Sequence, residues 1–248
     1  MPEGRWLERY QAGERELVWH ELRQLGDRVR EPEYAAEAQA VCDEMATRAA
    51  HNVRLVVARL REQGYRFHVN DNRQAAVEPF HPPGPEASAH VAWLEDHLGP
   101  IPMALSSWIR LVGDVWLVGT HPRWRESSDA DPLVIEAEGS RYPEASIADY
   151  FEDEHDAWEE ARDEGYDDEP FLLPLAPDAL HKANVSGGDP YGVPLPDRTA
   201  EGIFVGEVAM PFVAYLNHVF SNGGFPGQAD GDAQWEVRHS LSEGMLAL

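Results

Sequence analysis

The chain has 248 residues, and its 45 acidic side chains outnumber its 20 Lys and Arg residues, giving a formal net charge of −25. Phosphate binding requires an excess of cations, so this composition excludes a nucleic-acid-binding protein that relies on a general basic surface. An anionic membrane surface is disfavoured for the same reason. With 43% apolar residues and eight each of Trp, Tyr and Phe, the chain has enough large side chains to bury a core.

The cysteine content and the first residues predict a cytoplasmic protein. Cys42 is the only cysteine and cannot form an internal disulfide. The initial residues MPEGRWLERY lack the basic and apolar regions of a signal peptide. No run of residues approaches the ~18 apolar positions that a membrane helix needs.

Residues 1–78 are predicted to form a helical region. Within it, residues 31–63 give the clearest helix, because apolar side chains recur at steps of three and four up to Gly64. Leucines and tryptophans upstream predict one or two further helices, interrupted near Gly13 and Gly26. Residues 65–69 alternate large and polar side chains, which predicts a short strand.

A proline-rich segment, residues 79–85, is the strongest linker candidate, because four prolines in seven residues disfavour helix and sheet alike. We place a soft boundary there, with an α+β domain over residues 86–248, or alternatively one continuous domain. Helices are expected at 88–98 (capped by Ser88), 104–111, 147–164 and finally 210–220. Strands are expected at 114–119, 132–136, 171–175, 191–195 and 202–205. The predicted fold is α+β, with a mostly antiparallel or mixed central sheet flanked by helices and an N-terminal helical extension.

The usual signatures of catalysis are absent from the sequence. There is no glycine-rich phosphate-binding loop, no dinucleotide fingerprint, no nucleophile elbow and no His-Glu-x-x-His. Cys42 belongs to the apolar stripe of a predicted helix, which indicates an inert core thiol. We therefore predict no catalytic residue, no cofactor and no metal.

A glycine- and proline-rich loop over residues 178–197 carries the alternative hypothesis. Its carboxylates, amide and imidazole could bind a small ligand or, with Asp197 and His121, a divalent ion in a hydrolase. The other interpretation is structural, in which these side chains cap turns and bond to the backbone. The residues concerned are Asp178, His181, Asn184 and Asp189.

The charge is concentrated in residues 126–169, which hold eighteen acids but only Arg141 and Arg162, a net charge of −16. In the predicted helix, Tyr150, Phe151, Ala157, Trp158 and Ala161 recur at helical spacing and are expected to dock on the core. The acids between them are interpreted either as a solvated face or as a docking patch for a basic protein, since clustered charge accelerates association. The predicted partner-binding residues are Glu152, Asp153, Glu154, Asp156, Glu159, Glu160, Asp163, Glu164, Asp167, Asp168 and Glu169.

Residues 94–115 resemble the core signature of the SUKH superfamily, bacterial immunity proteins related to a yeast cell-wall synthesis regulator family. In that pattern a helix ends at Leu-Gly, a Leu/Ile-Pro pair opens a second helix carrying an aromatic residue, and a glycine turn leads into a strand. Here these places are filled by Leu98-Gly99, Ile101-Pro102, Trp108 and Gly113. The N-terminal helices and the loop at 173–196 lie outside the pattern.

The resemblance implies an α+β single-sheet fold without catalytic residues. For many bacterial members it also implies an immunity role, in which the protein binds and neutralises a toxin, often a nuclease. Nuclease toxins are usually basic because they bind phosphate, so an acidic surface suits an inhibitor. The leading prediction is a non-enzymatic cytoplasmic protein that neutralises a basic toxin through its acidic face, and the alternative is the hydrolase that uses the 178–197 loop.

Overall fold

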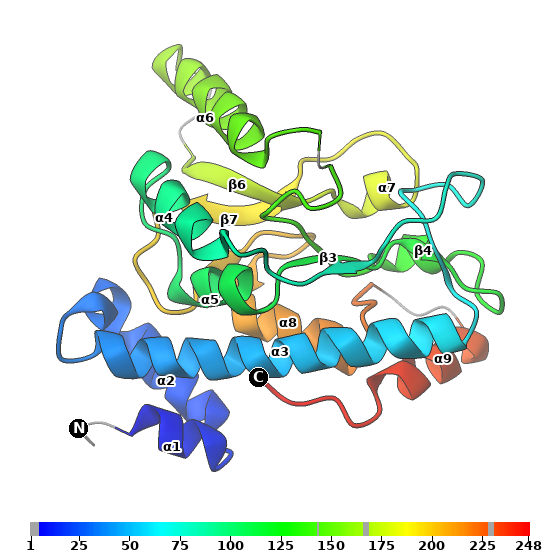
Figure 1. Ribbon diagram of the computed structural model, residues 1–248, viewed down its shortest axis with the longest axis horizontal. Helices are drawn as coiled ribbons and strands as arrows, with labels where there is room; N and C mark the ends of the chain where they lie inside the picture. The colour runs from blue at the N-terminus through cyan, green and yellow to red at the C-terminus, as the bar shows by residue number, and fades with distance from the viewer. Residues whose placement is uncertain (1–4, 143, 166–168, 228–230) are drawn as a thin grey trace.

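The longest element of the computed structural model is helix α3 (Ala35–Glu62), which runs along one side of the molecule (Figure 1). The structure describes residues 5–142, 144–165, 169–227 and 231–248. Helix α3 forms where the sequence predicts it, because Ala38, Val41 and Met45 recur at helical spacing and all three are fully buried. The remaining helices are α1 (Trp6–Gln11), α2 (Arg15–Leu25), η1 (Gly26–Arg30), α4 (Ala87–His97), α5 (Met103–Leu111), η2 (Ser127–Ala130), α6 (Ile147–Asp163), α7 (Ala179–Lys182), α8 (Phe212–Ser221) and α9 (Asp232–Ser242).

The strands are short and antiparallel. They are β1 (Arg66–Phe67), β2 (Phe80–His81), β3 (Asp114–Trp116), β4 (Gly119–Thr120), β5 (Val134–Ile135), β6 (Phe171–Ala176), β7 (Tyr191–Leu195), β8 (Ile203–Phe204) and β9 (Met210–Pro211). The central strands pair in the order β2-β3-β5, while β1 pairs with β4, β6 with β7 and β8 with β9. Together with the helices, they make the α+β fold that the sequence predicts.

A few backbone hydrogen bonds connect these small sheets to one another. The amide of Glu136, next to β5, donates to the carbonyl of Leu175 in β6 at 2.8 Å. Gly192 of β7 and Val205 next to β8 exchange two bonds of 3.0 and 2.8 Å. The strands therefore adjoin in the order β2-β3-β5-β6-β7-β8-β9, with α3, α5 and α8 on one side and α6 on the other (Figure 1).

Part of the proline-rich segment that the sequence predicts as a linker is a strand. Phe80 and His81 pair with Val115 and Asp114 of β3. The carbonyl of Pro79 extends this pairing by accepting the Trp116 amide at 2.8 Å. Proline has no amide to donate, but β2 is an edge strand, where that donor is not needed. Buried side chains from before and after this segment form one hydrophobic cluster, so residues 1–78 and 86–248 share a core.

Three other predicted boundaries differ from the structure. Helix α4 begins after Glu86 with no side-chain cap, so the prediction of Ser88 as its cap is wrong. Helix α8 begins at Phe212 rather than Met210, because Met210 and Pro211 pair with β8. Helix α9 was not predicted, because the helix corresponding to α8 was expected to be the last one.

Residues 94–115 form a helix–turn–helix–turn–strand unit. Helix α4 ends at His97 with Leu98 as its C-cap, and Gly99 follows with φ 89°, a conformation that favours glycine. Trp108 of α5 is fully buried, and its indole nitrogen donates to the carbonyl of Gly113 at 2.9 Å. Gly113 (φ 93°) must be glycine, because a Cβ there would lie 2.3 Å from the carbonyl oxygen of His81.

Candidate functional site

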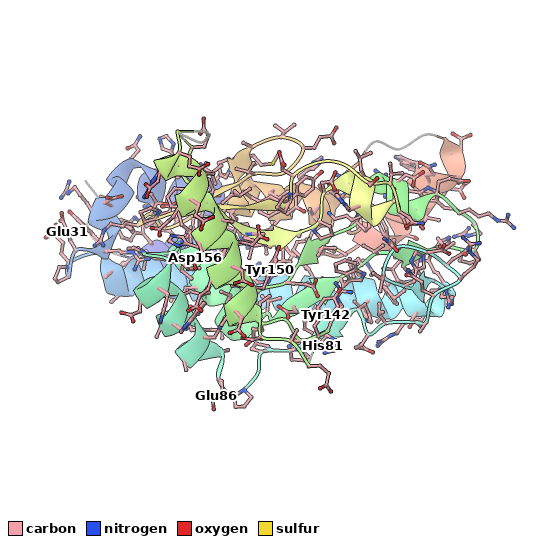
Figure 2. The ribbon with its side chains drawn as sticks, turned by 90° about the horizontal axis from the view of Figure 1, so that it is seen from above. Glu31, His81, Glu86, Tyr142, Tyr150 and Asp156 are labelled. Atoms are coloured by element: carbon pink, nitrogen blue, oxygen red, sulfur yellow. The ribbon has the colours of Figure 1, made fainter. Side chains whose placement is uncertain are left out.

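Helix α6 carries most of the predicted partner-binding residues. It begins where Ser146 caps it, with the Ser146 hydroxyl accepting the Asp149 amide at 3.1 Å. Phe151 is fully buried, while His155 and Trp158 contact Phe171 of β6 with ring centroids 4.9 and 5.8 Å apart. The helix lies at the surface, separated by the strands from α1–α3 (Figures 1 and 2).

The face by which α6 docks differs from the predicted one. Phe151 is buried and Trp158 and Ala161 are half-buried, as expected, but Ala157 and Tyr150 are exposed. Tyr150 instead borders a cavity. Helix α6 contacts Phe171 of the sheet through His155 and Trp158, whereas the ring of Tyr150 packs beside that of Phe151, with centroids 5.7 Å apart.

Every described member of the predicted acidic set is exposed to solvent. Between Glu152 and Glu164, the one ion pair of 4.0 Å or less among the described residues joins Asp163 to its neighbour Arg162. Asp167 and Asp168 lie outside the described residues. The exposed members are Glu152, Asp153, Glu154, Asp156, Glu159, Glu160, Asp163, Glu164 and Glu169. We call the exposed carboxylates of Glu152–Glu164 the acidic face.

Other acids of the same charged stretch are buried and paired. Asp131 accepts from the ammonium group of Lys182 at 2.5 Å, and the lysine side chain has no exposed surface. Glu136 pairs with Arg141 through two bonds of 2.5 and 2.7 Å. Burial raises the pKa of Glu136, although its hydrogen bond with Arg141 acts in the opposite direction. Most of the exposed carboxylates described in this stretch therefore lie on α6.

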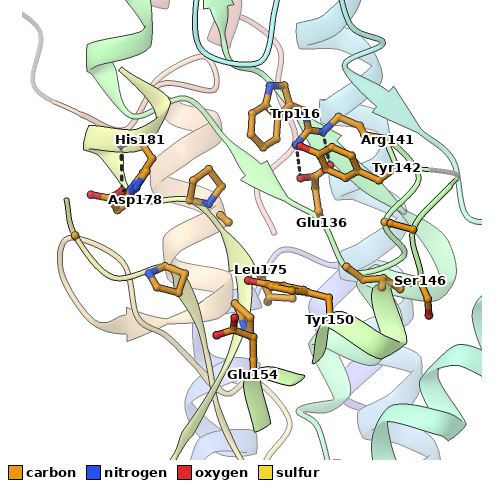
Figure 3. A pocket seen from close by; sticks show the side chains of 18 residues that line it. Trp116, Glu136, Arg141, Tyr142, Ser146, Tyr150, Glu154, Leu175, Asp178 and His181 are labelled. Carbon is orange, nitrogen blue, oxygen red and sulfur yellow. Dashed lines mark hydrogen bonds and ion pairs between the residues drawn. The ribbon is translucent and has the colours of Figure 1, made fainter. Parts of the chain in front are cut away.

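A cavity of about 580 Å³ opens beside the first half of α6 (Figure 3). Its floor includes Trp116 of β3 and Leu175 of β6, and Tyr150 and Glu154 of α6 form one wall. Asp178 and His181 border it on another side. Sequence reasoning missed this cavity, because its lining comes from separate segments that only the fold brings together.

One corner of the cavity already holds a guanidinium group. Arg141 lies 3.4 Å from the ring centroid of Trp116 and 4.8 Å from that of Tyr142, and it is bidentate on Glu136. The Arg141 side chain is only 6% exposed. Aromatic faces and a carboxylate thus hold this cation at the edge of the cavity.

Of the alternative ligand set, the structure brings two members together. The Nδ1 atom of His181 is hydrogen-bonded to Oδ1 of Asp178, which also caps α7 by accepting the amides of Leu180 and His181. Asn184 and Asp189 are exposed and are not part of this contact. These contacts match the structural interpretation of Asp178 and leave His181 at the edge of the cavity.

A search of the described residues for three or more possible metal ligands finds one group, His155, Asp156 and Glu159. His155 is half-buried against Phe171, whereas Asp156 and Glu159 are exposed, and exposed acidic groups of this kind are common without an ion. The loop at 178–197 is not among such groups. A metal centre of the alternative hydrolase therefore has two adjacent candidate ligands, Asp178 and His181, and no third in the part of the loop described.

Comparison with family models, with curated proteins and with solved structures gives no significant match. The SUKH resemblance therefore rests on residues 94–115 and stays a prediction. Among the described residues, no helix combines the length and apolar character of a membrane-spanning segment.

Proposed function

We propose that this chain is a non-enzymatic, cytoplasmic binding protein of the SUKH type that neutralises a basic toxin partner, such as a nuclease, through the acidic face of α6. The observation that carries the proposal is the exposure of these carboxylates with almost no internal partner. Like charges at i and i+4 on a helix cost a few tenths of a kcal/mol per pair. Faster or tighter association with a partner would offset this repulsion, which has no benefit within the isolated fold.

The physical benefit of this surface lies in the rate of encounter. A single-sign patch raises association rates by about 10–1000-fold over a neutral surface, and the effect declines with added salt. The carboxylates also stand in for the phosphates that a nuclease binds, so they can occupy its basic surface directly. Neither effect requires a catalytic group.

The test begins with a basic protein encoded next to this chain, assayed for toxicity alone and on co-expression. Reversal of Glu159, Glu160, Asp163 and Glu164 to Lys is then expected to slow association about 10–1000-fold at low ionic strength. The matched control reverses four exposed acids elsewhere, Glu62, Glu86, Glu236 and Glu243, and changes net charge equally. Circular dichroism checks that both variants fold.

An association rate that is the same for the wild type and the α6 variant contradicts the proposal. An equal decrease in both variants also contradicts it, because net charge rather than the acidic face would then govern binding. Stopped-flow kinetics from 20 to 500 mM salt measures both rates.

A second candidate function is a small-ligand hydrolase, because the Asp178–His181 pair borders a cavity of about 580 Å³. Its carboxylate–imidazole contact is the arrangement that orients a general base. Elemental analysis of the purified protein tests the metal version, which needs a stoichiometric ion. Loss of a hydrolytic activity in His181→Gln tests the metal-free version.

A further inference from the structure

The cavity beside α6 contains two walls of similar chemistry. On one side, Arg141 lies against the rings of Trp116 and Tyr142 and pairs with Glu136. On the opposite side, Tyr150 and Glu154 project from successive turns of α6 (Figure 3). They too provide an aromatic face and a carboxylate.

The second wall has no cation of its own among the described residues. Tyr150 as a residue is 43% exposed, and no described Arg or Lys lies over its ring or within 4.0 Å of the Glu154 carboxylate. Asp178 lines the cavity as a further carboxylate, with His181 against it. The cavity therefore offers an aromatic ring and a carboxylate to a second cationic side chain, which no described residue provides.

The balance of charge in the cavity favours a cation as occupant. Glu136 pairs with Arg141, and Asp178 already accepts from His181 and from two amides of α7, which leaves Glu154 as the lining carboxylate without a partner among the described residues. The floor of proline, leucine and tryptophan side chains suits the methylene groups of a long side chain. A volume of about 580 Å³ exceeds that of a single side chain and leaves room for its neighbours in a short segment.

We propose that this cavity receives an arginine side chain of the basic protein partner, stacked on Tyr150 and paired with Glu154. The inference rests on the proposed function and gives it an anchor point within the acidic face. Arginine fits better than lysine, because a planar guanidinium both stacks on an aromatic ring and pairs with a carboxylate in two bonds. The Arg141 site across the cavity uses both of these contacts.

The probe for this site is a capped pentapeptide with one arginine among glycines. A single cation minimises diffuse attraction to the acidic face. Titrated into the isotopically labelled full chain, it is expected to shift the backbone amide signals of residues that line the cavity, in a saturable way. The same peptide with citrulline, which is isosteric but neutral, is expected to leave these signals in place.

Tyr150→Ala and Glu154→Gln are each expected to weaken peptide binding about three- to tenfold, the range for a cation–π contact or a charge-assisted bond. Both positions are exposed, so the fold should persist, and circular dichroism checks it. Glu160→Gln is the matched control, because it removes the same charge from the same helix outside the cavity. Its binding is expected to change less than twofold.

Equal binding of the citrulline and arginine peptides overturns the inference, as does equal weakening by Glu160→Gln and Glu154→Gln. In either case, slower partner association after reversal of the acidic face would still support the proposed function. Conversely, the peptide could bind at the cavity while the rate of partner association does not depend on the charge of α6. That result would support the arginine site and contradict the proposed function.

Discussion

The N-terminal helices and helix α6 are both rich in charge, but they use it in opposite ways. Residues 1–62 hold ten Arg and twelve acids, and much of this charge is paired within the fold. The N···O distances run from 2.7 to 3.2 Å in the pairs Arg9–Glu21, Arg23–Glu201, Arg28–Glu31, Arg30–Glu95 and Arg48–Glu44. In the part of the chain that the structure describes, the acidic face of α6 has one pair, Arg162–Asp163, at 4.0 Å.

This difference separates charge that belongs to the fold from charge that is available to a partner. Glu201 is buried and accepts from Arg23 and from the amide of Val213, so it joins α2 to α8. Removing such a group leaves its partner without a bond. Apart from Asp163, the carboxylates of the acidic face have no ion-pair partner among the described residues, so removing one of them should cost the fold little.

The largest effect is expected for Asp131→Asn, because Asp131 is a buried acid of the same charged stretch. The variant leaves the ammonium group of Lys182 without its counter-ion, and losing one member of a buried pair costs about 3–5 kcal/mol. Asparagine tolerates the left-handed backbone at this position (φ 51°), so the change isolates charge. Urea unfolding measures the loss.

The double variant Asp131→Asn with Lys182→Met provides the control for this prediction. It removes both charges and is expected to recover most of the lost stability. A single variant within about 1 kcal/mol of the wild type would show that the pair is not needed for folding.

Phe151→Ala is expected to be next, with a loss of about 3 kcal/mol, because Phe151 is the buried anchor of α6. Hydrogen exchange should show faster opening of α6 than of α3. Tyr150→Ala, on the exposed side of the same turn, is the matched control. Equal losses in the two variants would mean that α6 is held by its whole surface rather than by a narrow stripe.

Removing a single carboxylate charge is expected to change stability by a smaller amount, with opposite sign in the N-terminal helices and in α6. Glu21→Gln weakens the bidentate contact with Arg9 and should destabilise the protein by about 1 kcal/mol. Glu160→Gln relieves repulsion from Asp156 and Glu164 at i and i+4 and should stabilise it by a few tenths of a kcal/mol. Thermal unfolding measures the stability of both variants. Destabilisation by Glu160→Gln would contradict the expected difference between the two regions.

The pH dependence around His121 gives the smallest effect. Burial lowers the pKa of His121, whose Nδ1 accepts the Arg123 amide and whose Nε2 contacts the side-chain oxygen of Gln63. The unfolded chain therefore binds a proton first as pH falls below 6.5, so this residue costs stability on acidification. His121→Asn should narrow the difference in Tm between pH 7 and pH 5 by about 2 °C. An unchanged difference in His121→Asn would contradict the prediction.

The parts of the fold that could be predicted are those governed by local spacing. Helices α3 and α5 and strands β6 and β7 follow from the recurrence of apolar residues over short windows. The pairing of Phe80 with Val115 could not, because neighbouring prolines mask a strand whose partner lies 35 residues away. Helix α9 escaped prediction because its charged and aromatic side chains are mostly exposed and show only a weak apolar stripe.

The sequence alone determined how much charge the protein carries and that it gathers in residues 126–169, since both are counts along the chain. It also determined that these acids lie on an amphipathic helix, because helical spacing is local. Only the tertiary structure decided which acids are paired. Asp131 meets Lys182 across 51 residues of chain, whereas the carboxylates of α6 meet solvent. The cavity at Tyr150 and Glu154 likewise depends on the tertiary structure, because its walls come from segments that make contact only in the folded protein.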